Sequence, residues 1–421
     1  MANLEFIQFT PMREVVEAGL IRWEHDKGSR QIEDLPQIFW GSGEPWTEAN
    51  HWALTIATRT VGGHIKTVTS LMKHLYAYAD WLEAEELDWR HFPDRMADRV
   101  IVRYRGELIA QRNRGVLRPS TTTARMRALI QFYRHAQIYG FVSQHSSMWH
   151  DEVVLLRYFD SAGFERSISR QKSELAIPNR ARPGLTLEDG LVPLQSDHVQ
   201  ALLDFTASES LEEIHLMLTI GFLTGARIGS ILTLAVQNIE GAIPDPNMSG
   251  FYRLPIGPGT KVSTKFDTIG DLLVPSFLID ALNTYTYSMR RLSRQALALP
   301  EHRSSLFLTS RGNPYREQSF NRLMTDLRRR TVAAGLNFMK TFKFHQTRCT
   351  YGTWLMEVAL QVTNEACAVA FVREAMLHKD ETTTLRYVRF IQRAPIKALI
   401  SKEFTAAFTG IINRDWNLFH A

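Results

Sequence analysis

The chain has few cysteines and no long apolar run, and these absences narrow its class. Its two cysteines, Cys349 and Cys367, have the spacing of neither a metal-ligand set nor a CxxC redox motif. Even the apolar run LMLTIGFL ends after eight residues, far short of a membrane span. The N-terminus, MANLEFIQFTPMREVV, lacks the basic-then-apolar order of a secretory signal. These features predict a protein of the reducing cytoplasm, without a membrane partner.

The composition is that of a globular protein with more than one core. Hydrophobic residues make up 44% of the chain and charged residues 22%, which is typical of a folded protein rather than a disordered one. A length of 421 residues exceeds what a single core usually supports, so we expect two or more domains. There is no internal repeat and no low-complexity segment.

Positive charge is concentrated in one part of the N-terminal half. The net charge is only +5, but the stretch from Arg90 to Arg134 holds eleven arginines, three acidic residues and no lysine. Guanidinium groups match the geometry of phosphate oxygens, so this bias indicates phosphate contacts. A solvated helical face is the alternative interpretation of the same cluster.

Apolar periodicity and chain breakers divide the sequence into segments. Residues 1–45 have little periodicity and are predicted to form an arm, whereas residues 46–150 carry apolar positions at helical spacing, typical of a small helical bundle. Residues 151–195 are basic and interrupted by proline and glycine, which is typical of a linker. Helices resume over 196–412, and 413–421 form a tail. We expect a mainly α fold with a small β-hairpin or sheet in the C-terminal domain, formed by FYRLPI and DLLVP.

Three short motifs in the C-terminal half carry side chains suited to binding a phosphate. Arg227 follows a Thr-Gly turn in TGARIGSILTL, directly after a very apolar helix. His345 and Arg348 stand three residues apart in HQTR, so on a helix they share a face and can reach one ligand. His378 precedes Tyr387 by nine residues in MLHKDETTTLRYVR. Each motif taken singly is equally compatible with an ordinary structural role.

A lysine near the tip of the predicted hairpin completes the set. Lys265 lies ten residues before Pro275 and just ahead of the predicted turn DTIGD, so we prefer it. Lys261 would require a longer hairpin and stays an alternative.

The order and separation of these motifs resemble the catalytic signature of the tyrosine recombinases, which include the phage integrases, such as lambda integrase, the Xer recombinases and Cre. The resemblance is carried by TGAR ending at Arg227, HQTR ending at Arg348, and LH leading through three threonines to Tyr387. It implies that residues 46–150 are the family's helical, SAM-like core-binding domain and 196–412 its catalytic domain. Two such domains form a clamp around duplex DNA.

The resemblance also implies a site-specific recombinase that cleaves and rejoins DNA strands. Tyr387 would attack a phosphodiester, leaving a 3′-phosphotyrosyl link and a free 5′-hydroxyl. Arg227 and Arg348 would stabilise the charge that develops in the transition state. His378 would donate a hydrogen bond to a non-bridging oxygen, and His345 would assist proton movement at the phenol.

The hairpin lysine, Lys265 by preference, would protonate the departing 5′-oxygen. We expect no cofactor, because the covalent link conserves the energy of the bond for religation. The sequence likewise shows no carboxylate cluster for a two-metal site and no glycine-rich phosphate loop followed by lysine.

Double-stranded DNA is the expected partner, together with further copies of the chain, forming a tetramer in the synapse, and possible accessory DNA-binding proteins. In this family the segment after the tyrosine commonly packs onto a neighbouring protomer; the alternative is a helix folded back on its own domain. The candidate DNA-contacting residues lie in the arginine-rich bundle and the basic linker: Arg112, Arg114, Arg118, Arg125, Arg127, Arg134, Arg166, Arg170, Lys172, Arg180 and Arg182.

Three positions depart from the family pattern. Ser230 stands where an acidic residue is usual, Leu377 replaces the common glycine before the last histidine, and Cys349 replaces a frequent histidine. None of these removes a group with a direct chemical role. The leading hypothesis is an integrase or a tyrosine-type transposase of a mobile element. A type IB topoisomerase-like enzyme or a hairpin-forming resolvase would use the same chemistry without partner exchange, and a DNA-binding accessory protein with a decayed site is the third interpretation.

Overall fold

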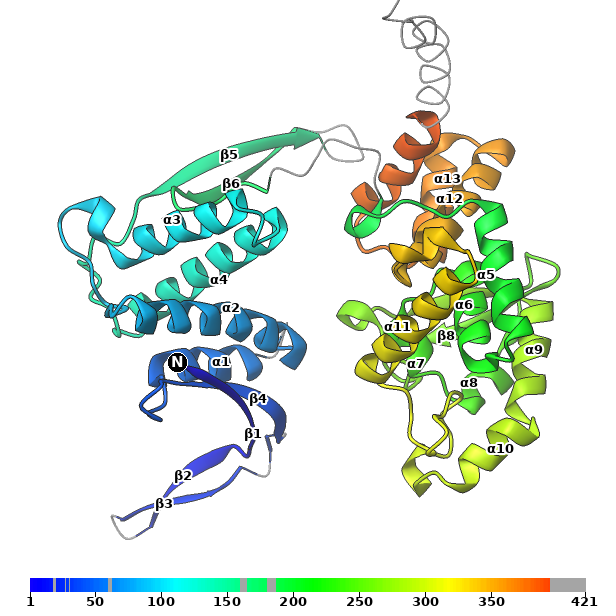
Figure 1. Cartoon of the computed structure of the whole chain (residues 1–421), viewed down its shortest axis with the longest axis horizontal. Coiled ribbons are helices and arrows are strands. Elements are labelled where there is room, and N and C mark those ends of the chain that lie inside the picture. Colours follow the sequence, from blue (N-terminus) through cyan, green and yellow to red (C-terminus); the bar gives the residue numbers. More distant parts are fainter. Residues whose placement is uncertain are drawn as a thin grey trace, which may run out of the picture. The chain divides into compact units, whose positions relative to one another are not determined.

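The chain divides into two compact units. The computed structural model describes residues 1–17, 20–26, 28–29, 31–59, 63–159, 165–179 and 187–393. The first unit is Met1–Pro183 and the second is Gly184–Ala421 (Figure 1). The division falls inside the range 151–195, for which the composition predicts a linker.

The first unit is organised around a helical layer with an aromatic core. Its α-helices are α1 (Thr47–Ala57), α2 (Ile65–Ala84), α3 (Val100–Asn113) and α4 (Pro119–Ile138). The core includes Tyr78, Trp89 and Tyr133, all 5% exposed or less. Tyr133 donates to the carbonyl of Trp89 at 2.6 Å, and the Tyr78 and Tyr133 hydroxyls lie 2.6 Å apart. The aromatic rings therefore fill the core while their hydroxyls keep hydrogen-bond partners.

Pairs of antiparallel strands flank these helices. They are β1 (Asn3–Phe9) with β4 (Ile32–Phe39), β2 (Met12–Glu17) with β3 (Leu20–His25), and β5 (Asp151–Phe159) with β6 (Glu165–Ser173). The composition of residues 1–45 and 151–195 predicts an arm and a basic linker, without paired strands. Leu35 and Ile38 of β4 are buried, whereas every residue of β3 is exposed. A ribbon with water on both faces need not alternate apolar and polar residues, so its sequence lacks the usual strand signal.

The second unit is mainly α-helical and has a small sheet. Its helices are α5 (Ser196–Ser208), α6 (Glu212–Thr224), α7 (Ile228–Leu232), α8 (Val236–Glu240), α9 (Ser276–Thr286), α10 (Met289–Ala296), α11 (Glu317–Ala333), α12 (His345–Val362), α13 (Glu365–Ala375) and residues 381–393. The sheet has the order β7 (Ile243–Pro244), β8 (Phe251–Ile256), β9 (Gly270–Pro275). The predicted fold class, mainly α with a small sheet in the C-terminal half, is confirmed.

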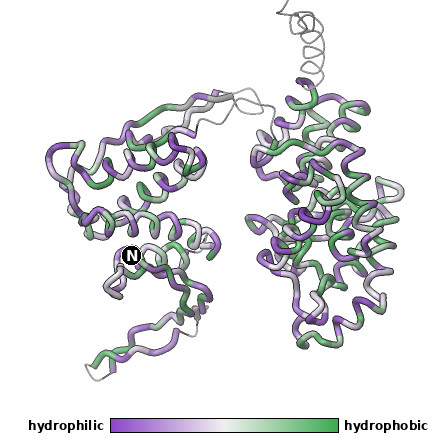
Figure 2. Tube along the Cα trace, viewed as in Figure 1, coloured by the Kyte–Doolittle hydropathy of each residue, from purple (hydrophilic) through white to green (hydrophobic). Residues whose placement is uncertain are grey.

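Helix α6 is the centre of the second unit. Its residues Ile214, Met217, Leu218 and Phe222 are 2% exposed or less, so the helix is buried on several sides rather than along one stripe. Along the outer helices, hydrophobic and hydrophilic residues alternate around the axis (Figure 2). None of the helices within the described ranges combines the length and hydropathy that crossing a membrane requires. The packing of α6 against α12 fixes the segments that carry the predicted site residues.

Candidate active site

A tight turn between α6 and α7 positions Arg227. Gly225 ends α6 in the left-handed conformation, at φ 64°, and a Cβ there would lie 2.5 Å from Cδ1 of Tyr351. Glycine is therefore required both by the backbone and by the close approach of the ring. Arg227 follows at the start of α7, half-buried at the edge of a pocket. Burial, and then the charge of Arg348, lower the pKa of Arg227 to about 10, so the guanidinium stays protonated at neutral pH.

The first turn of α12 supplies His345 and Arg348 on one face of the helix. The Arg348 side chain is only 3% exposed. Its Nη1 donates to the carbonyl of Gly225 at 2.7 Å, and its Nη2 donates to the carbonyl of Met376 at 2.6 Å. Arg348 thus connects the turn before Arg227 with the turn before His378, and both connections fix the direction of its guanidinium.

His378 and Tyr387 come from the turn after α13 and from the helical residues 381–393. Both side chains are buried, at 1% exposure for the His378 side chain and 0% for Tyr387. Their rings stack with centroids 6.1 Å apart. Thr384 places its hydroxyl 2.9 Å from Nδ1 of His378, so one helical segment holds both the tyrosine and the partner of the histidine.

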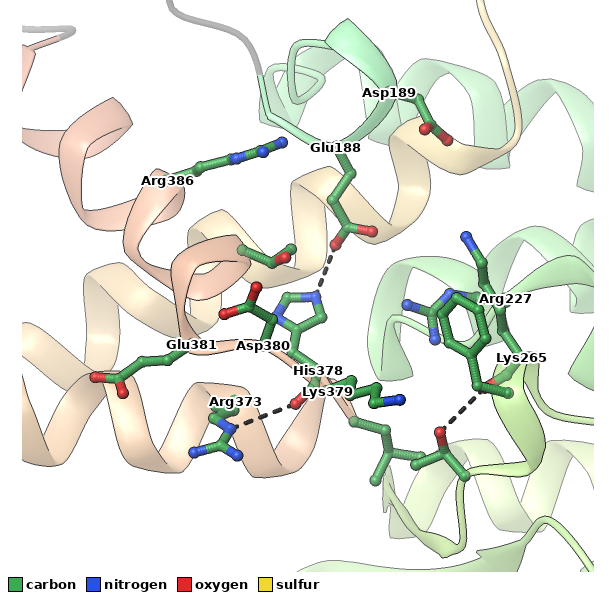
Figure 3. Close-up of a pocket in the computed structure, with 14 residues that line it drawn as sticks. Glu188, Asp189, Arg227, Lys265, Arg373, His378, Lys379, Asp380, Glu381 and Arg386 are labelled. Atoms are coloured by element: carbon green, nitrogen blue, oxygen red, sulfur yellow. Dashed lines mark hydrogen bonds and ion pairs between the residues drawn. The ribbon is translucent and has the colours of Figure 1, made fainter. Parts of the chain in front are cut away.

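The carboxylate of Glu188 lies at the point where these side chains meet, and Figure 3 shows its contact with His378. Its Oε1 accepts hydrogen bonds from His378 Nε2 at 2.8 Å and from the Tyr387 hydroxyl at 2.9 Å. Arg348 Nε lies 3.2 Å from Oε1 and 3.3 Å from Oε2, and His345 Nε2 lies 3.2 Å from Oε2. Four of the predicted site residues therefore converge on one anion.

The charge of Glu188 sets the protonation of its neighbours. Burial alone opposes its ionisation, but hydrogen bonds from His345 and His378 and the charge of Arg348 outweigh burial, so the pKa of Glu188 lies far below its usual range. An ionised carboxylate only accepts hydrogen bonds, so Nε2 of His378 carries the proton and Nδ1 accepts from Thr384. Burial and then the charge of Glu188 raise the pKa of Tyr387 well above its ordinary value. In this arrangement the phenol is protonated.

An open, polar pocket lies beside Glu188 (Figure 3). Its basic lining residues are Arg227, Lys265, Arg373, His378, Lys379 and Arg386. Lys265, the preferred lysine, therefore shares the pocket with Arg227 and His378, whereas Lys261 is not among the lining residues. Within the described ranges there is no group of His, Cys, Asp and Glu side chains arranged to hold a metal ion.

The departures from the family pattern have structural explanations. Ser230 donates to the carbonyl of Ser263 at 2.8 Å and so ties α7 to the connection that carries Lys265. Leu377 has φ 50°, the left-handed conformation for which glycine is usual, and its side chain covers Gly270, where a Cβ would collide with it. Burial raises the pKa of the Cys349 thiol to about 12, which leaves it unreactive at neutral pH.

The candidate DNA-contacting residues fall into three groups. Arg112, Arg114 and Arg118 surround the α3–α4 connection, and Arg114 pairs with Glu107 at 3.0 Å. Arg127, Arg134 and Lys172 line one pocket between α4 and the β5–β6 hairpin, whereas Arg125 is partly buried in α4. Arg166 and Arg170 belong to β6, but their side chains are not described, and Arg180 and Arg182 lie outside the described residues.

Two site residues have no counterpart in the sequence analysis. Glu188 is a lone acidic residue in LTLEDGLVPL, inside the range predicted as a linker, and nothing in its local pattern points to a site. Gly352, one turn after Arg348, allows the ring of Tyr387 to approach α12: a Cβ there would lie 2.6 Å from Cε1 of Tyr387 and 2.6 Å from the sulfur of Met376. Only the tertiary contact distinguishes this glycine from any other.

For the reaction that the resemblance implies, in which Tyr387 attacks DNA, we expect Gly352→Ala to slow covalent attachment. The added methyl group collides with the Tyr387 ring, and overpacking of this kind costs about 1–3 kcal/mol, on the order of a tenfold to hundredfold rate loss if the strain falls on the tyrosine. Single-turnover adduct formation measures the effect. Gly229→Ala in α7 is the matched control, because a Cβ there meets no atom within 4 Å. Equal rates for wild type and Gly352→Ala would show that the contact does not position the ring.

Comparisons with known proteins define the class of fold. No protein-family model matches the chain, and no curated protein matches it by sequence. The structure is similar to that of the Tn1549 transposon integrase (residues 82–397) in complex with transposon right-end DNA, with a TM-score of 0.51 and 14% identity, over 81% of this chain and 94% of that one. Lambda integrase bound to DNA is similar over 78% of this chain and 90% of that one, at 13% identity and a TM-score of 0.43.

The likeness to the Tn1549 integrase extends over most of both chains and shows the fold. This chain therefore has the fold of the tyrosine recombinases, as the order of its motifs predicts.

Proposed function

We propose that this chain is a site-specific DNA recombinase, an integrase or a tyrosine-type transposase, that works through a 3′-phosphotyrosyl intermediate. The observation that carries the proposal is the convergence of His345, Arg348, His378 and Tyr387 on a single carboxylate. A carboxylate and a phosphate share the same requirements, namely negative charge and several hydrogen-bond donors. A site built to satisfy one of them therefore suits the other.

The cations of the site match the charge that phosphoryl transfer develops. A phosphodiester carries one negative charge, and attack by the tyrosine oxygen adds a second in the five-coordinate transition state. Fixed donors aimed at that charge lower the barrier more than they stabilise the substrate. Arg348 is held by two backbone carbonyls, and Arg227 faces the open pocket, so one guanidinium would approach the phosphate from within the protein and the other from the pocket side.

Each proton in the proposed reaction has a carrier. Tyr387 forms its O–P bond as the P–O5′ bond breaks, and the phenolic proton leaves through His345 or water. Lys265, across the pocket from His378, gives a proton to the departing 5′-oxygen. Religation reverses these steps with the 5′-hydroxyl of a partner strand, so the energy of the phosphodiester stays in the tyrosyl link and neither metal nor nucleotide takes part.

Duplex DNA is the proposed substrate. The related Tn1549 integrase structure is a complex with transposon-end DNA, and the first unit of this chain carries the arginines of the α3–α4 region. We propose that these arginines and the pocket residues Arg127 and Lys172 contact the backbone of the duplex. Exchange of strands needs two duplexes cut in turn, so we propose a tetramer on DNA.

The test uses DNA that flanks the gene in its genome, placed on two distinguishable duplexes. A recombinase joins segments of the two duplexes, and protease digestion followed by mass spectrometry places the DNA adduct on the peptide that contains Tyr387. Relaxation of any supercoiled plasmid by the monomeric chain, without joined products, would instead assign a topoisomerase-like activity. An adduct on another residue would contradict the proposed mechanism.

A further inference from the structure

We propose that Glu188 is an internal substitute for the DNA phosphate, one that closes the active site in the DNA-free chain and is displaced by the substrate. The inference rests on the proposed function, because it assigns the phosphate position to the place that Glu188 occupies. It adds a step that the chemistry of the reaction does not require: removal of a resident anion before the tyrosine can act.

The burial of the site is the first argument. With Glu188 in place, the side chains of Arg348 and His378 are 3% and 1% exposed, and Tyr387 is 0% exposed. The open pocket is lined by Glu188 itself, but not by Arg348 or Tyr387, which lie behind it. A phosphate that enters the pocket reaches Arg227 and Lys265 directly, but it meets the carboxylate of Glu188 before it can reach Arg348 or the nucleophile.

The hydrogen bonds are the second argument. Oε1 of Glu188 accepts from His378 and Tyr387 and lies 3.2 Å from Arg348 Nε, so the three groups that must act on phosphorus are all engaged by one oxygen. Burial, and then the charge of Glu188, raise the pKa of Tyr387 and so disfavour the phenolate. Glu188 therefore blocks access and adds to the cost of ionising the nucleophile.

The backbone around Glu188 explains how the carboxylate can leave. Leu187 is buried beside Tyr387 in one hydrophobic cluster, and its N–H donates to the carbonyl of Leu191 at 2.8 Å, which closes a tight turn. On the far side, the Leu194 N–H donates to the Thr350 hydroxyl at 2.9 Å. The residues 187–194, which we call the strap, are therefore held at both ends, by the buried side chain of Leu187 and by the hydrogen bond from Leu194 to Thr350 of α12, while Glu188 and its neighbour lie between these anchors.

The middle of the strap is strained. Asp189 has φ 53°, a conformation that costs a non-glycine residue about 1–3 kcal/mol. Its side chain points away from Glu188 and is 80% exposed (Figure 3). A change of this turn can thus withdraw Glu188 while both anchors stay in place, and relief of the strain offsets part of the cost of breaking its hydrogen bonds.

Electrostatic interactions favour the replacement of Glu188 by the DNA phosphate. Two anions cannot share one set of donors, so a phosphate enters only as Glu188 leaves. The carboxylate carries one charge throughout, whereas the reacting phosphorus group gains a second, so the cations favour the DNA most strongly in the transition state. A loosely held phosphate would therefore not displace Glu188 from its hydrogen-bond donors, whereas a well-positioned phosphate would.

The experiment measures anion binding by the full-length chain, with orthovanadate as the phosphate analogue and calorimetry as the readout. Glu188→Gln keeps the shape of the side chain but removes its charge, so we expect vanadate to bind at least about tenfold more tightly than to wild type. Asp280→Asn is the matched control, because it removes one negative charge from an exposed residue of α9 that does not line the pocket, and we expect a change below about twofold. Unchanged or weaker binding by Glu188→Gln would overturn the proposal.

A second variant covers the case in which Glu188→Gln folds poorly. Glu188→Asp keeps the charge but withdraws the carboxylate by one methylene group, so its vanadate affinity should fall between those of wild type and Glu188→Gln. Vanadate should also raise the melting temperature of either variant more than that of wild type, because ligand binding stabilises the folded state. A Glu188→Asp chain with wild-type affinity and no added thermal shift would contradict the displacement.

Cleavage kinetics separate this role from a catalytic one. If Glu188 inhibits, Glu188→Gln forms the DNA adduct at least as fast as wild type. If Glu188 were instead the base that deprotonates Tyr387, Glu188→Gln would lose adduct formation. Slower cleavage by Glu188→Gln than by wild type would therefore overturn the inhibitory role, whatever the affinity of the variant for vanadate. If neither wild type nor Glu188→Gln cleaves DNA, the proposed recombinase function is wrong. Tighter vanadate binding by Glu188→Gln would in that case still support the proposal that an anion displaces Glu188.

Discussion

Tyr387→Phe is expected to abolish covalent attachment to DNA while DNA affinity changes by less than about twofold, because the substitution removes one hydroxyl that makes a single hydrogen bond to Glu188. The ring is fully buried and packs in a cluster with Leu187 and Val388, so phenylalanine keeps the shape of the site. The neighbouring Cys349 cannot take over as the nucleophile, because burial raises the pKa of its thiol to about 12 and leaves it protonated.

A duplex nicked beside the cleavage site traps the intermediate, because the short fragment diffuses away and religation fails. Denaturing gel electrophoresis then shows the protein–DNA adduct, and a parallel binding titration gives the affinity. Tyr351→Phe is the matched control: Tyr351 is a buried tyrosine of α12 that packs on Gly225 and makes no contact with Glu188. An adduct band that persists in Tyr387→Phe would remove Tyr387 from the mechanism, and a band that vanishes equally in Tyr351→Phe would show that the loss is not specific to Tyr387.

Arg227→Ala and Arg348→Ala are both expected to slow cleavage by on the order of a hundredfold to a thousandfold, the loss typical of one removed transition-state donor. Their effects on folding should differ. Arg348 is buried, donates to the carbonyls of Gly225 and Met376, and balances the charge of Glu188, so its loss leaves a buried carboxylate and two carbonyls without partners. Such losses cost about 3–5 kcal/mol of unfolding free energy.

Within the described ranges, no hydrogen bond holds the Arg227 guanidinium, which lines the open pocket. Arg227→Ala should therefore cleave slowly yet melt within a few degrees of wild type. Thermal unfolding and single-turnover cleavage, measured on both variants, test the contrast. Equal losses in cleavage rate and in DNA affinity would make both arginines docking groups instead. A stable Arg348→Ala chain would contradict the structural role that its buried contacts assign to it.

Much of the candidate site could be predicted because its residues lie in short motifs with local rules. His345 and Arg348 share a helical face whatever the helix packs against, and the Thr-Gly turn before Arg227 needs only Gly225. The strands β8 and β9 could be predicted for a similar reason, since their apolar ends bracket an obvious turn. The ribbon β2–β3 could not, because it is too exposed to carry an alternating pattern.

Glu188 and Gly352 show where prediction from the sequence stops. Neither has a local pattern, and each acquires its role from a residue far along the chain: Glu188 from Tyr387, 199 positions away, and Gly352 from the close approach of the same ring. The preference for Lys265 over Lys261 also depended on hairpin length, which the sequence leaves open. The structure places Lys265 in the lining of the pocket, and its catalytic role stays a prediction.

The sequence by itself determined the order and types of the groups that can act on a phosphate, together with the mainly helical fold that carries them. These depend on side-chain chemistry and on spacings within single helices and turns. Only the tertiary structure decided that four of these groups already hold an anion, because hydrogen bonds and burial depend on segments that packing brings together. Glu188, the carboxylate that these four groups contact, lies outside every motif, so only the fold brings it to the candidate site.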